Sequence, residues 1–403
     1  WNVHEESFFP KLKPLSSLTF RVSYSLTGTP PDASYCNALT KLSMNTPYRP
    51  TTTDKELGFV VAALGNDELT YEKKHEFNFG VDAGFFNNRL NVTFDVYQRR
   101  NFDEIAPTVT QLYGTAYANV GSMKSWGEEL SISSTNVKTN DFSWQTSLIY
   151  SHNRTEITDL YNQGRVIDLV QGNGFAKQGY PARALFSIPF VGVNEKGYPV
   201  CINEKGQATV GDLNFQERDN TDYLIYEGST DPIYNGSLGN TFNYKGFHLN
   251  LFLTYAFGNV VRLDPVFSAK YNDLTSMTHD FKNRWMQPGD ENVTNVPGVV
   301  SRYEYEQNRT LLSTAYNAYN YTSVRTAKGD FIRLKEISLA YDFPHRWLEN
   351  SPVNNISLKL QATNLMLLYA DKKLNGQDPE FMNAGGVASP MPKQFTLTLK
   401  LGL

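Results

Sequence analysis

The last nine residues constrain this chain most, because their side chains alternate strictly between apolar and polar. Positions 395, 397, 399, 401 and 403 carry Phe or Leu, and the positions between them carry Thr, Lys or Gly. A period of two over this length predicts a β-strand with two unlike faces. A membrane barrel accepts such a strand, because lipid lies outside it and water or polar side chains lie inside. We expect Phe395, Leu397, Leu399 and Leu401 to face lipid, and Thr396, Thr398 and Lys400 to line the lumen.

The composition agrees with a barrel and excludes a bundle of membrane-spanning helices. Only 40% of the 403 residues are hydrophobic, whereas 13% are aromatic. The longest plain apolar run covers residues 59–64, far short of the roughly 18 residues that a spanning helix needs. In a barrel only alternate residues face lipid, so the same composition suffices. The net charge of −4 gives no sign of a surface for nucleic acid.

Alternating runs recur along the chain between turn signals such as Asn87-Asn88, Asn140-Asp141 and Lys245-Gly246. They predict roughly ten to twelve strands of about nine to fourteen residues. Three long stretches, residues 30–68, 159–231 and 262–329, are expected to be loops, and the second is expected to be too polar for a core. Short turns that alternate with long loops are typical of outer-membrane barrels. The clearest strands are predicted at residues 18–24, 77–82, 90–96, around 130–132, 142–150, 237–244, 247–257, 330–343, 356–363 and 395–403.

The sequence contains no pattern that predicts catalysis. Glu128 and Glu129 are adjacent on a predicted strand, so they point to opposite faces and cannot converge on one glycosidic bond. The six histidines show no zincin spacing, and neither a G-x-S-x-G nor a nucleotide-binding P-loop occurs. We therefore expect no enzymatic activity, no cofactor and no metal.

The two cysteines and the amino-terminal residues bear on disulfide formation and on export of the chain. Cys36 and Cys201 lie in polar, loop-like surroundings, where one disulfide and two free thiols are both compatible with the sequence. The first residues have neither the basic nor the apolar region of a signal peptide. An exported barrel with this start is expected to be a processed or partial chain.

Tyrosines crowd one of the long loops and are our candidate substrate contacts. A tyrosine ring offers contact area at low entropic cost, and its hydroxyl can bond a sugar or a peptide. Two other roles stay open for them, an aromatic girdle at the membrane interface and the packing of loop against loop. The candidates are Tyr303, Tyr305, Tyr316, Tyr319 and Tyr321.

An ordered set of motifs resembles the SusC/RagA-like TonB-dependent transporters. Residues 18–28 (LTFRVSYSLTG) resemble a strand and turn of that family, and residues 72–90 resemble its following hairpin. Each motif is short, but together they span nearly all 403 residues in the family's order. The remaining similar segments are residues 119–130, 238–247, 330–344, 362–365 and 378–380.

The resemblance implies an all-β transmembrane antiparallel barrel of about 22 strands, to which residues 1–403 contribute the C-terminal half. It implies import of oligosaccharides or peptides across a Gram-negative outer membrane, with a SusD-like lipoprotein as lid and the TonB-ExbB-ExbD complex as energy source. The plug, the TonB box and the first strands are expected to come from another chain or a portion of polypeptide outside this sequence. Two positions depart from the family pattern. Leu403 stands where an aromatic residue is usual, and residues 211–222 lack the glycine turn and ligand spacing of a calcium loop.

The competing interpretation is a secreted soluble all-β protein that binds glycans or serves as a scaffold. Its strands would also alternate. Its turns, however, should recur every 8–12 residues or so, which the long loops of this chain do not allow.

Overall fold

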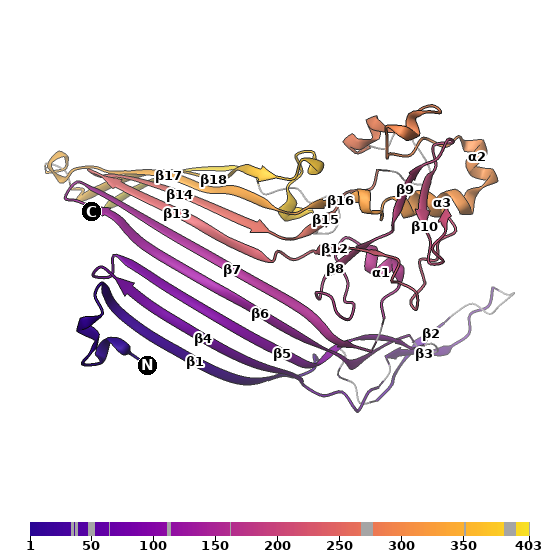
Figure 1. Ribbon diagram of the computed structural model, residues 1–403, viewed down its shortest axis with the longest axis horizontal. Coiled ribbons are helices and arrows are strands. Elements are labelled where there is room, and N and C mark those ends of the chain that lie inside the picture. The colour runs from indigo at the N-terminus through magenta and orange to yellow at the C-terminus, as the bar shows by residue number, and fades with distance from the viewer. Residues whose placement is uncertain are drawn as a thin grey trace.

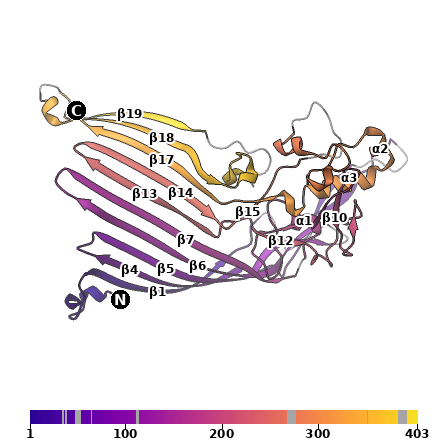
Figure 2. The ribbon, with the colours of Figure 1, turned by 45° about the horizontal axis from the view of Figure 1, so that its top comes forward.

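A curved antiparallel sheet of ten strands dominates the computed structural model, with an assembly of shorter elements at one end (Figures 1 and 2). Both chain termini lie at the other end of the sheet (Figure 1). The structure describes residues 1–33, 36, 39–46, 53–63, 65–110, 114–161, 163–266, 277–349, 352–382 and 392–402.

The sheet is a meander, because the order of its strands in space is their order along the chain. The strands of this sheet appear where period-two alternation predicts them, and its ten strands agree with the lower end of the predicted range. The described residues contain nine further short strands outside this sheet, which were not predicted. In sheet order they are β1 (Leu15–Thr29), β4 (Glu72–Phe85), β5 (Leu90–Thr110), β6 (Gly114–Lys138), β7 (Phe142–Leu160), β13 (Tyr234–Tyr244), β14 (Phe247–Phe257), β17 (Phe331–Asp342), β18 (Asn355–Ala370) and β19 (Gln394–Gly402).

Two of the three predicted turns, at Asn87-Asn88 and Lys245-Gly246, are confirmed by left-handed backbone angles. Asn87 and Asn88 have φ values of 57° and 59°, the left-handed region that asparagine tolerates better than most residues. Lys245 and Gly246 have φ values of 46° and 88°. Lys245 and Gly246 join the paired residues Tyr244 and Phe247 directly, and positive φ at both central residues is what a type I′ turn requires. The Asn87-Asn88 connection is longer, because Phe85 pairs with Leu90 and Phe86 also has a positive φ.

The strand register separates an apolar face of the sheet from a polar face. Thr93 pairs with Asp82 on one side and Ser131 on the other, in a row of the polar face. The neighbouring row belongs to the apolar face and runs across six strands through Val92, Ile132, Leu148, Leu238, Leu253 and Leu334.

The three longest strands extend well beyond the thickness of a bilayer. β5, β6 and β7 have 21, 25 and 19 residues, whereas a tilted spanning strand needs about 9–11. The predicted upper limit of fourteen residues was therefore wrong for these strands. The alternation stops beyond the apolar rows, where Lys124, Trp126 and Glu128 follow one another on the same face, but the backbone pairing continues.

The loop assembly at the end of the sheet is folded and has its own core, so the expectation that residues 159–231 are too polar for a core is wrong. Val166, Leu169, Ile188 and Cys201 are buried there together with Ala318 from a later loop. The elements are α1 (Val166–Val170), β8 (Ala184–Ser187), β9 (Phe190–Val193), β10 (Pro199–Ile202), β11 (Ala208–Thr209), β12 (Ile225–Ser229), β15 (Val260–Arg262), α2 (Arg302–Gln307), α3 (Arg309–Tyr319) and β16 (Thr326–Lys328).

Two further details complete the fold. A hairpin of β2 (Lys41–Asn45) and β3 (Gly58–Ala63) lies within the stretch that was expected to be a plain loop. In the part of the chain that the structure describes, no helix combines the length and the hydrophobicity needed to cross a membrane. Short 3-10 turns occur at Val3–Glu5, Phe9–Lys11, His279–Asn283, Asp290–Asn292, Ser323–Arg325, His345–Trp347, Lys372–Leu374 and Pro379–Phe381.

Candidate functional site

The polar face carries a fixed ion network near its first strands. Arg21 donates from Nε to Asp82 Oδ2 at 2.7 Å and from Nη2 to Asp95 Oδ2 at 3.1 Å. Thr93 Oγ1 donates to Asp82 Oδ1 at 2.9 Å. Gly80 lies between Arg21 and Asp95 in the register, and a Cβ there would be 2.5 Å from Asp95 Oδ1. Glycine at this position therefore leaves room for the guanidinium to bridge two strands.

A second polar group lies further toward the loop assembly. Glu76 pairs with Lys74 at 2.7 Å and with Arg99 at 3.1 Å. The Arg99 guanidinium lies over the ring of Tyr97, 4.1 Å from its centroid, and the Tyr97 hydroxyl donates to Asn153 Oδ1 at 3.1 Å. Together the two groups place charged and neutral hydrogen-bonding atoms along one wall. Such a wall can contact a polar ligand or another polar protein surface without a bound metal.

A buried ion pair fixes the connection between β18 and β19. Arg333 on β17 contacts Asp378 Oδ2 at 2.5 Å and Glu380 Oε2 at 3.1 Å. The side chains of Arg333 and Asp378 are only 5% and 7% exposed. Breaking such a pair is costly, because one charge is left buried without its partner. Residues 371–382 are thereby held against the sheet.

The terminal strand places the predicted residues on opposite faces, as its alternation requires. Phe395 and Leu397 are 70% and 69% exposed, and Leu399 and Leu401 are 58% and 56% exposed. Thr396, Thr398 and Lys400 pair with Gln361, Lys359 and Ser357 on the other face. Which face meets lipid and which meets the lumen stays a prediction. Leu403, the last apolar position of the pattern, lies outside the described residues.

The structure brings most of the predicted tyrosines together, but as part of a core. Tyr305, Tyr316 and Tyr319 are 8%, 3% and 1% exposed, and they pack with Leu312 and Val266. The Tyr316 hydroxyl donates to the carbonyl of Gly298 at 2.6 Å. Burial raises the pKa of Tyr319 to about 12 and also raises that of Tyr316. Within the described residues these three rings pack in the core of the loop assembly, which is the loop packing that the sequence left open.

The three tyrosines are buried because residues 309–319 form a helix, α3, that the sequence analysis missed. Leu312, Ala315, Tyr316 and Tyr319 recur at the spacing of one face of α3, and that face packs into the loop assembly. Tyr303 on α2 remains 78% exposed, and Tyr321 is half-buried beside Phe215. For Tyr303 and Tyr321, contact with a substrate stays a prediction.

Arg262 is a buried cation that sequence reasoning also missed. Its Nη1 donates to Ser187 Oγ at 3.1 Å and to the Thr322 carbonyl at 2.8 Å. Its Nη2 donates to the carbonyls of Val170 and Phe186 at 3.1 and 2.6 Å. Burial lowers the pKa of Arg262 to about 10. Because its partners are mostly carbonyls from distant segments, nothing in the sequence around Arg262 marks it as the link between them.

Both cysteines are free thiols in this structure, Cys36 exposed and Cys201 buried. Burial raises the pKa of the Cys201 thiol to about 12. In the loop at residues 211–222, Glu217 accepts hydrogen bonds from the backbone N–H groups of Asp219 and Asn220 at 3.0 and 3.2 Å. Within the described ranges, no group of three or more His, Cys, Asp and Glu is placed to hold a metal.

The comparisons with known proteins give relatives of one kind, although no family model matches the chain. TonB-dependent receptor P3 of Formosa agariphila is 25% identical over 404 residues, covering 94% of this chain and 37% of that protein. TonB-dependent receptor SusC of Bacteroides thetaiotaomicron is 26% identical over 430 residues, covering 100% and 39%. The solved structure of the RagAB peptide transporter superposes with a TM-score of 0.76 at 24% identity, covering 100% of this chain and 42% of that chain. The chain thus spans about two fifths of the length of these proteins.

Proposed function

We propose, from the similarity of this chain to SusC/RagA-like TonB-dependent receptors of the Gram-negative outer membrane, that it forms barrel wall and outer loops of a nutrient importer. The relatives confirm the resemblance that the ordered motifs indicate. The antiparallel sheet and its structural match confirm the expected fold class. Because the relatives are receptors and transporters, they also confirm the expectation that the chain is not an enzyme.

The exposed apolar face of the sheet supports this role most directly. On β19 its four apolar side chains are 56–70% exposed, and each exposed CH₂ group costs about 0.8 kcal/mol in water. Acyl chains remove that cost, whereas the competing secreted protein would need a second layer over Leu397, Leu399 and Leu401. The observed exposure of these three residues therefore favours the membrane barrel over the secreted protein.

In the proposed mechanism this chain performs no bond chemistry. A SusD-like lipoprotein would hold the ligand against the loop assembly, and the TonB-ExbB-ExbD complex would pull on a plug carried by the N-terminal portion of the transporter. The ligand would then pass along the polar face, where Arg21, Asp82 and Asp95 form a fixed network. Thr396, Thr398 and Lys400 would line that path or contact the plug.

The ligand is an oligosaccharide or a peptide, and an uptake experiment separates the two. The complete transporter gene, including its N-terminal portion, is deleted and then restored in its host, and growth is measured on a panel of oligosaccharides and a panel of peptides. We expect loss of growth on members of one panel, recovery with the restored gene, and the same loss when TonB is depleted. Unchanged uptake of every member of both panels after deletion would contradict the proposed function.

A further inference from the structure

A band of basic residues lies on the apolar face where that face approaches the loop assembly. The alternation of β4 carries the face from Phe79 through Phe77 to His75, and that of β7 carries it from Tyr150 to Arg154. One row of the register there reads Phe77, Gln98, Trp126 and Arg154, and the next reads His75, Arg100, Lys124 and Glu156. With Lys73 one row beyond, the basic band consists of Lys73, Arg100, Lys124 and Arg154.

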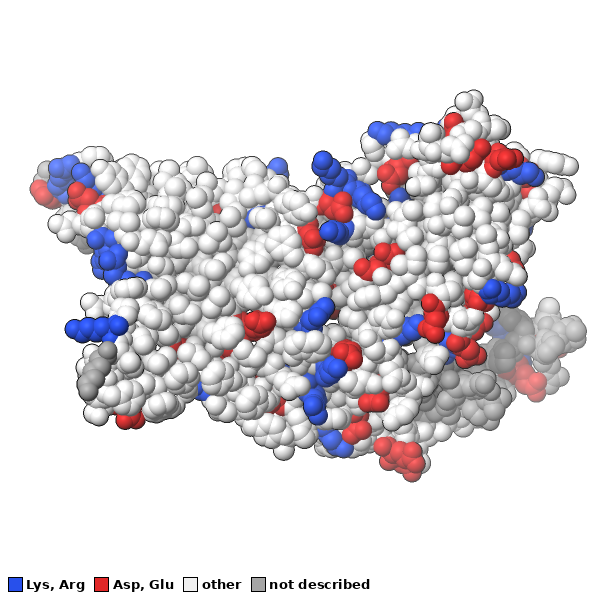
Figure 3. All heavy atoms as spheres, in the orientation of Figure 1, with Lys and Arg blue, Asp and Glu red and all other residues white. Residues whose placement is uncertain are grey.

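The band marks the edge of a region with almost no charge. In Figure 3 the middle of the strand region is nearly white, and Lys and Arg atoms, with Asp and Glu atoms among them, lie where β5, β6 and β7 run toward the loop assembly. Arg100 lies four residues beyond Val96 on the same face of β5, which is about 13 Å along a strand. Phe102 follows Arg100 on that face. Phe77 and Trp126 occupy the row next to Arg100, so the basic band lies at the end of the apolar rows, where the headgroup layer begins if acyl chains cover those rows.

Two of the four basic residues are not neutralised by the protein. Lys124 pairs with Glu156 at 2.9 Å and Lys73 pairs with Asp103 at 2.7 Å. Arg100 and Arg154 are both exposed, and neither makes an ion pair or side-chain hydrogen bond with any residue that the structure describes. Two guanidinium groups therefore remain free to bind anions.

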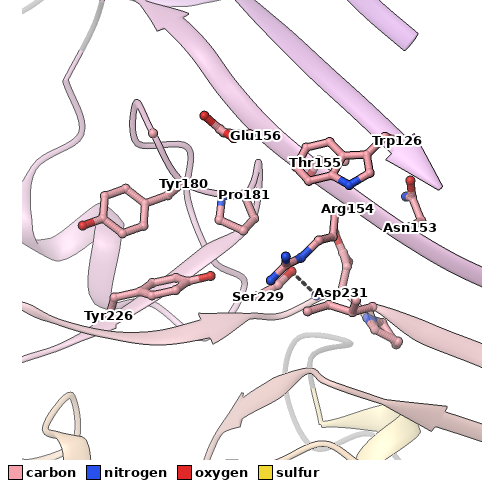
Figure 4. Close-up of a pocket in the computed structure, with 13 residues that line it drawn as sticks. Trp126, Asn153, Arg154, Thr155, Glu156, Tyr180, Pro181, Tyr226, Ser229 and Asp231 are labelled. Carbon is pink, nitrogen blue, oxygen red and sulfur yellow. Dashed lines mark hydrogen bonds between the residues drawn. The ribbon is translucent and has the colours of Figure 1, made fainter. Parts of the chain in front are cut away.

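Arg154 points into a pocket of about 370 Å³ that also offers aromatic rings (Figure 4). The ring of Trp126 lies on one side of it, and Tyr180 and Tyr226 lie across from Trp126 (Figure 4). A guanidinium binds phosphate oxygens through two parallel hydrogen bonds. The carboxylates of Glu156 and Asp231 also line the pocket, and each pairs with a cation, Lys124 and Arg183 respectively. Sugar rings stack on aromatic faces, so Arg154 and these rings suit a phosphate that is attached to a sugar.

The backbone N–H groups of β7 near the same pocket point toward the loops. Asn153 N–H donates to the Ile233 carbonyl at 3.0 Å, and Ile157 N–H donates to the Tyr180 carbonyl at 2.9 Å. Thr155 lies between Asn153 and Ile157 in the chain and lines the pocket. Among the described residues, the Thr155 N–H group has no backbone acceptor on the side of β7 that faces these loops. The edge of the sheet is therefore bonded to loop residues on both sides of Thr155, and the Thr155 hydroxyl accepts from Ala182 N–H at 3.4 Å.

We infer that the basic band binds the phosphate groups of an anionic glycolipid in the outer leaflet of the membrane, one phosphate at Arg154 and another at Arg100. The inference rests on the proposed function, because only a membrane barrel places the band at headgroup level. A free phosphorylated sugar would share the phosphate chemistry. The lipid is favoured because the band continues an apolar face, which acyl chains need and a free anion does not.

The test compares the complete transporter with a variant that carries Arg100→Gln and Arg154→Gln. The matched control carries Arg302→Gln and Arg309→Gln, which remove two exposed arginines on α2 and α3, away from the sheet. Native mass spectrometry in detergent measures the affinity of each protein for diphosphoryl lipid A, for its dephosphorylated form and for inorganic phosphate. We expect the first variant to lose at least about tenfold in affinity for diphosphoryl lipid A, because it loses two charge-assisted contacts. The control should bind this lipid like the unmodified transporter, and the dephosphorylated form should bind all three proteins weakly.

Several results would overturn the lipid site. They are equal affinity of the two variants for diphosphoryl lipid A, equal binding of the dephosphorylated form, or inorganic phosphate that binds as tightly as the lipid. Uptake and heat-dependent gel migration are measured on the same proteins. Intact uptake with unchanged lipid affinity in the Arg100/Arg154 variant removes the lipid site alone, whereas a complete transporter that neither inserts nor transports removes the proposed function.

Discussion

At the scale of single residues, Gly127 shows how close approach on the sheet depends on the absence of a side chain. Its partner in the register is Tyr97, and a Cβ at Gly127 would lie 2.6 Å from the Tyr97 hydroxyl and 2.3 Å from the carbonyl oxygen of His152. Because one of these atoms is backbone, Gly127→Ala should force a strand to shift and destabilise the barrel by about 1–3 kcal/mol. The measurement is the temperature at which the complete barrel unfolds, followed by gel migration.

Gly28→Ala is the matched control, since the nearest atom to a Cβ there is Tyr71 Cδ1 at 3.7 Å, an ordinary contact. It should leave the unfolding temperature unchanged. If both substitutions lower the unfolding temperature equally, the close approach at Gly127 does not contribute to the stability of the barrel.

The thiols of Cys36 and Cys201 should differ in reactivity, because one is exposed and the other is buried. Burial raises the pKa of Cys201 from 9.0 to about 12, whereas Cys36 is exposed. The thiolate is the reactive form, so iodoacetamide at pH 8 should label Cys36 and leave Cys201 unmodified until the protein is denatured. Peptide mapping by mass spectrometry measures both sites in one sample, and equal labelling in the native protein would contradict the burial of Cys201.

The raised pKa of Cys201 also makes the stability of the folded protein depend on pH in a defined direction. Because the pKa of Cys201 is raised in the folded state, its contribution to stability is complete below about pH 9 and decreases as the pH rises toward 12. Replacing Cys201 with Ala should remove this part of the alkaline loss of stability, which denaturation at pH 8 and pH 10 can measure.

At the scale of elements, the connection between β18 and β19 depends on one buried ion pair. Asp378→Asn keeps the shape and the hydrogen-bond acceptor but leaves the Arg333 guanidinium, 5% exposed, without full compensation. We expect a loss of about 3–5 kcal/mol, the usual cost of breaking a buried pair, and faster hydrogen exchange at residues 371–382. Asp212→Asn is the control, because Asp212 and Lys205 are 67% and 60% exposed and 3.8 Å apart, and exposed pairs contribute little. Exchange that is unchanged in the Asp378 variant would show that other contacts hold this connection.

The terminal strand gives a second prediction at this scale. Leu399→Arg would place a charge on the face that we expect to meet lipid, at a cost of up to about 2–4 kcal/mol near the midplane. Thr398→Arg places the same charge on the opposite face, where Lys400 already lies. Assembly yield in the outer membrane should fall more for Leu399→Arg, and equal yields would contradict the assignment of the two faces.

Elements with a regular period were predictable, and elements defined by distant partners were not. The hairpin at Asn87-Asn88 and the strand from Gln394 follow from local alternation and turn chemistry. The four-residue strands β8 and β10 are too short to show a period, and their core is completed by Ala318, more than a hundred positions away. The tyrosines at 305, 316 and 319 were recognised as a cluster, but their burial follows from α2 and α3, which a loop interpretation does not contain.

At the scale of the whole molecule, the sheet has two open edges. β19 pairs only with β18, and the outer edge of β1 is met by residues 1–2 at Thr19 and Phe20, within the part of the chain that is described. Unpaired backbone groups in hydrocarbon cost several kcal/mol each, so a sheet with such edges requires further strands to complete a barrel. We propose that the N-terminal portion of the transporter supplies these strands along with the plug.

The 403-residue chain expressed alone should therefore fail to form a closed barrel. Coexpression with the N-terminal portion, as a separate polypeptide or as one continuous chain, should restore membrane insertion and the heat-dependent gel migration of a folded barrel. A control that supplies the plug without its barrel strands should not restore them, because the open edges of β1 and β19 would remain unpaired. Insertion and closure of the chain without any companion would mean that β1 and β19 can satisfy their backbone groups in another way, and the requirement for added strands would then be wrong.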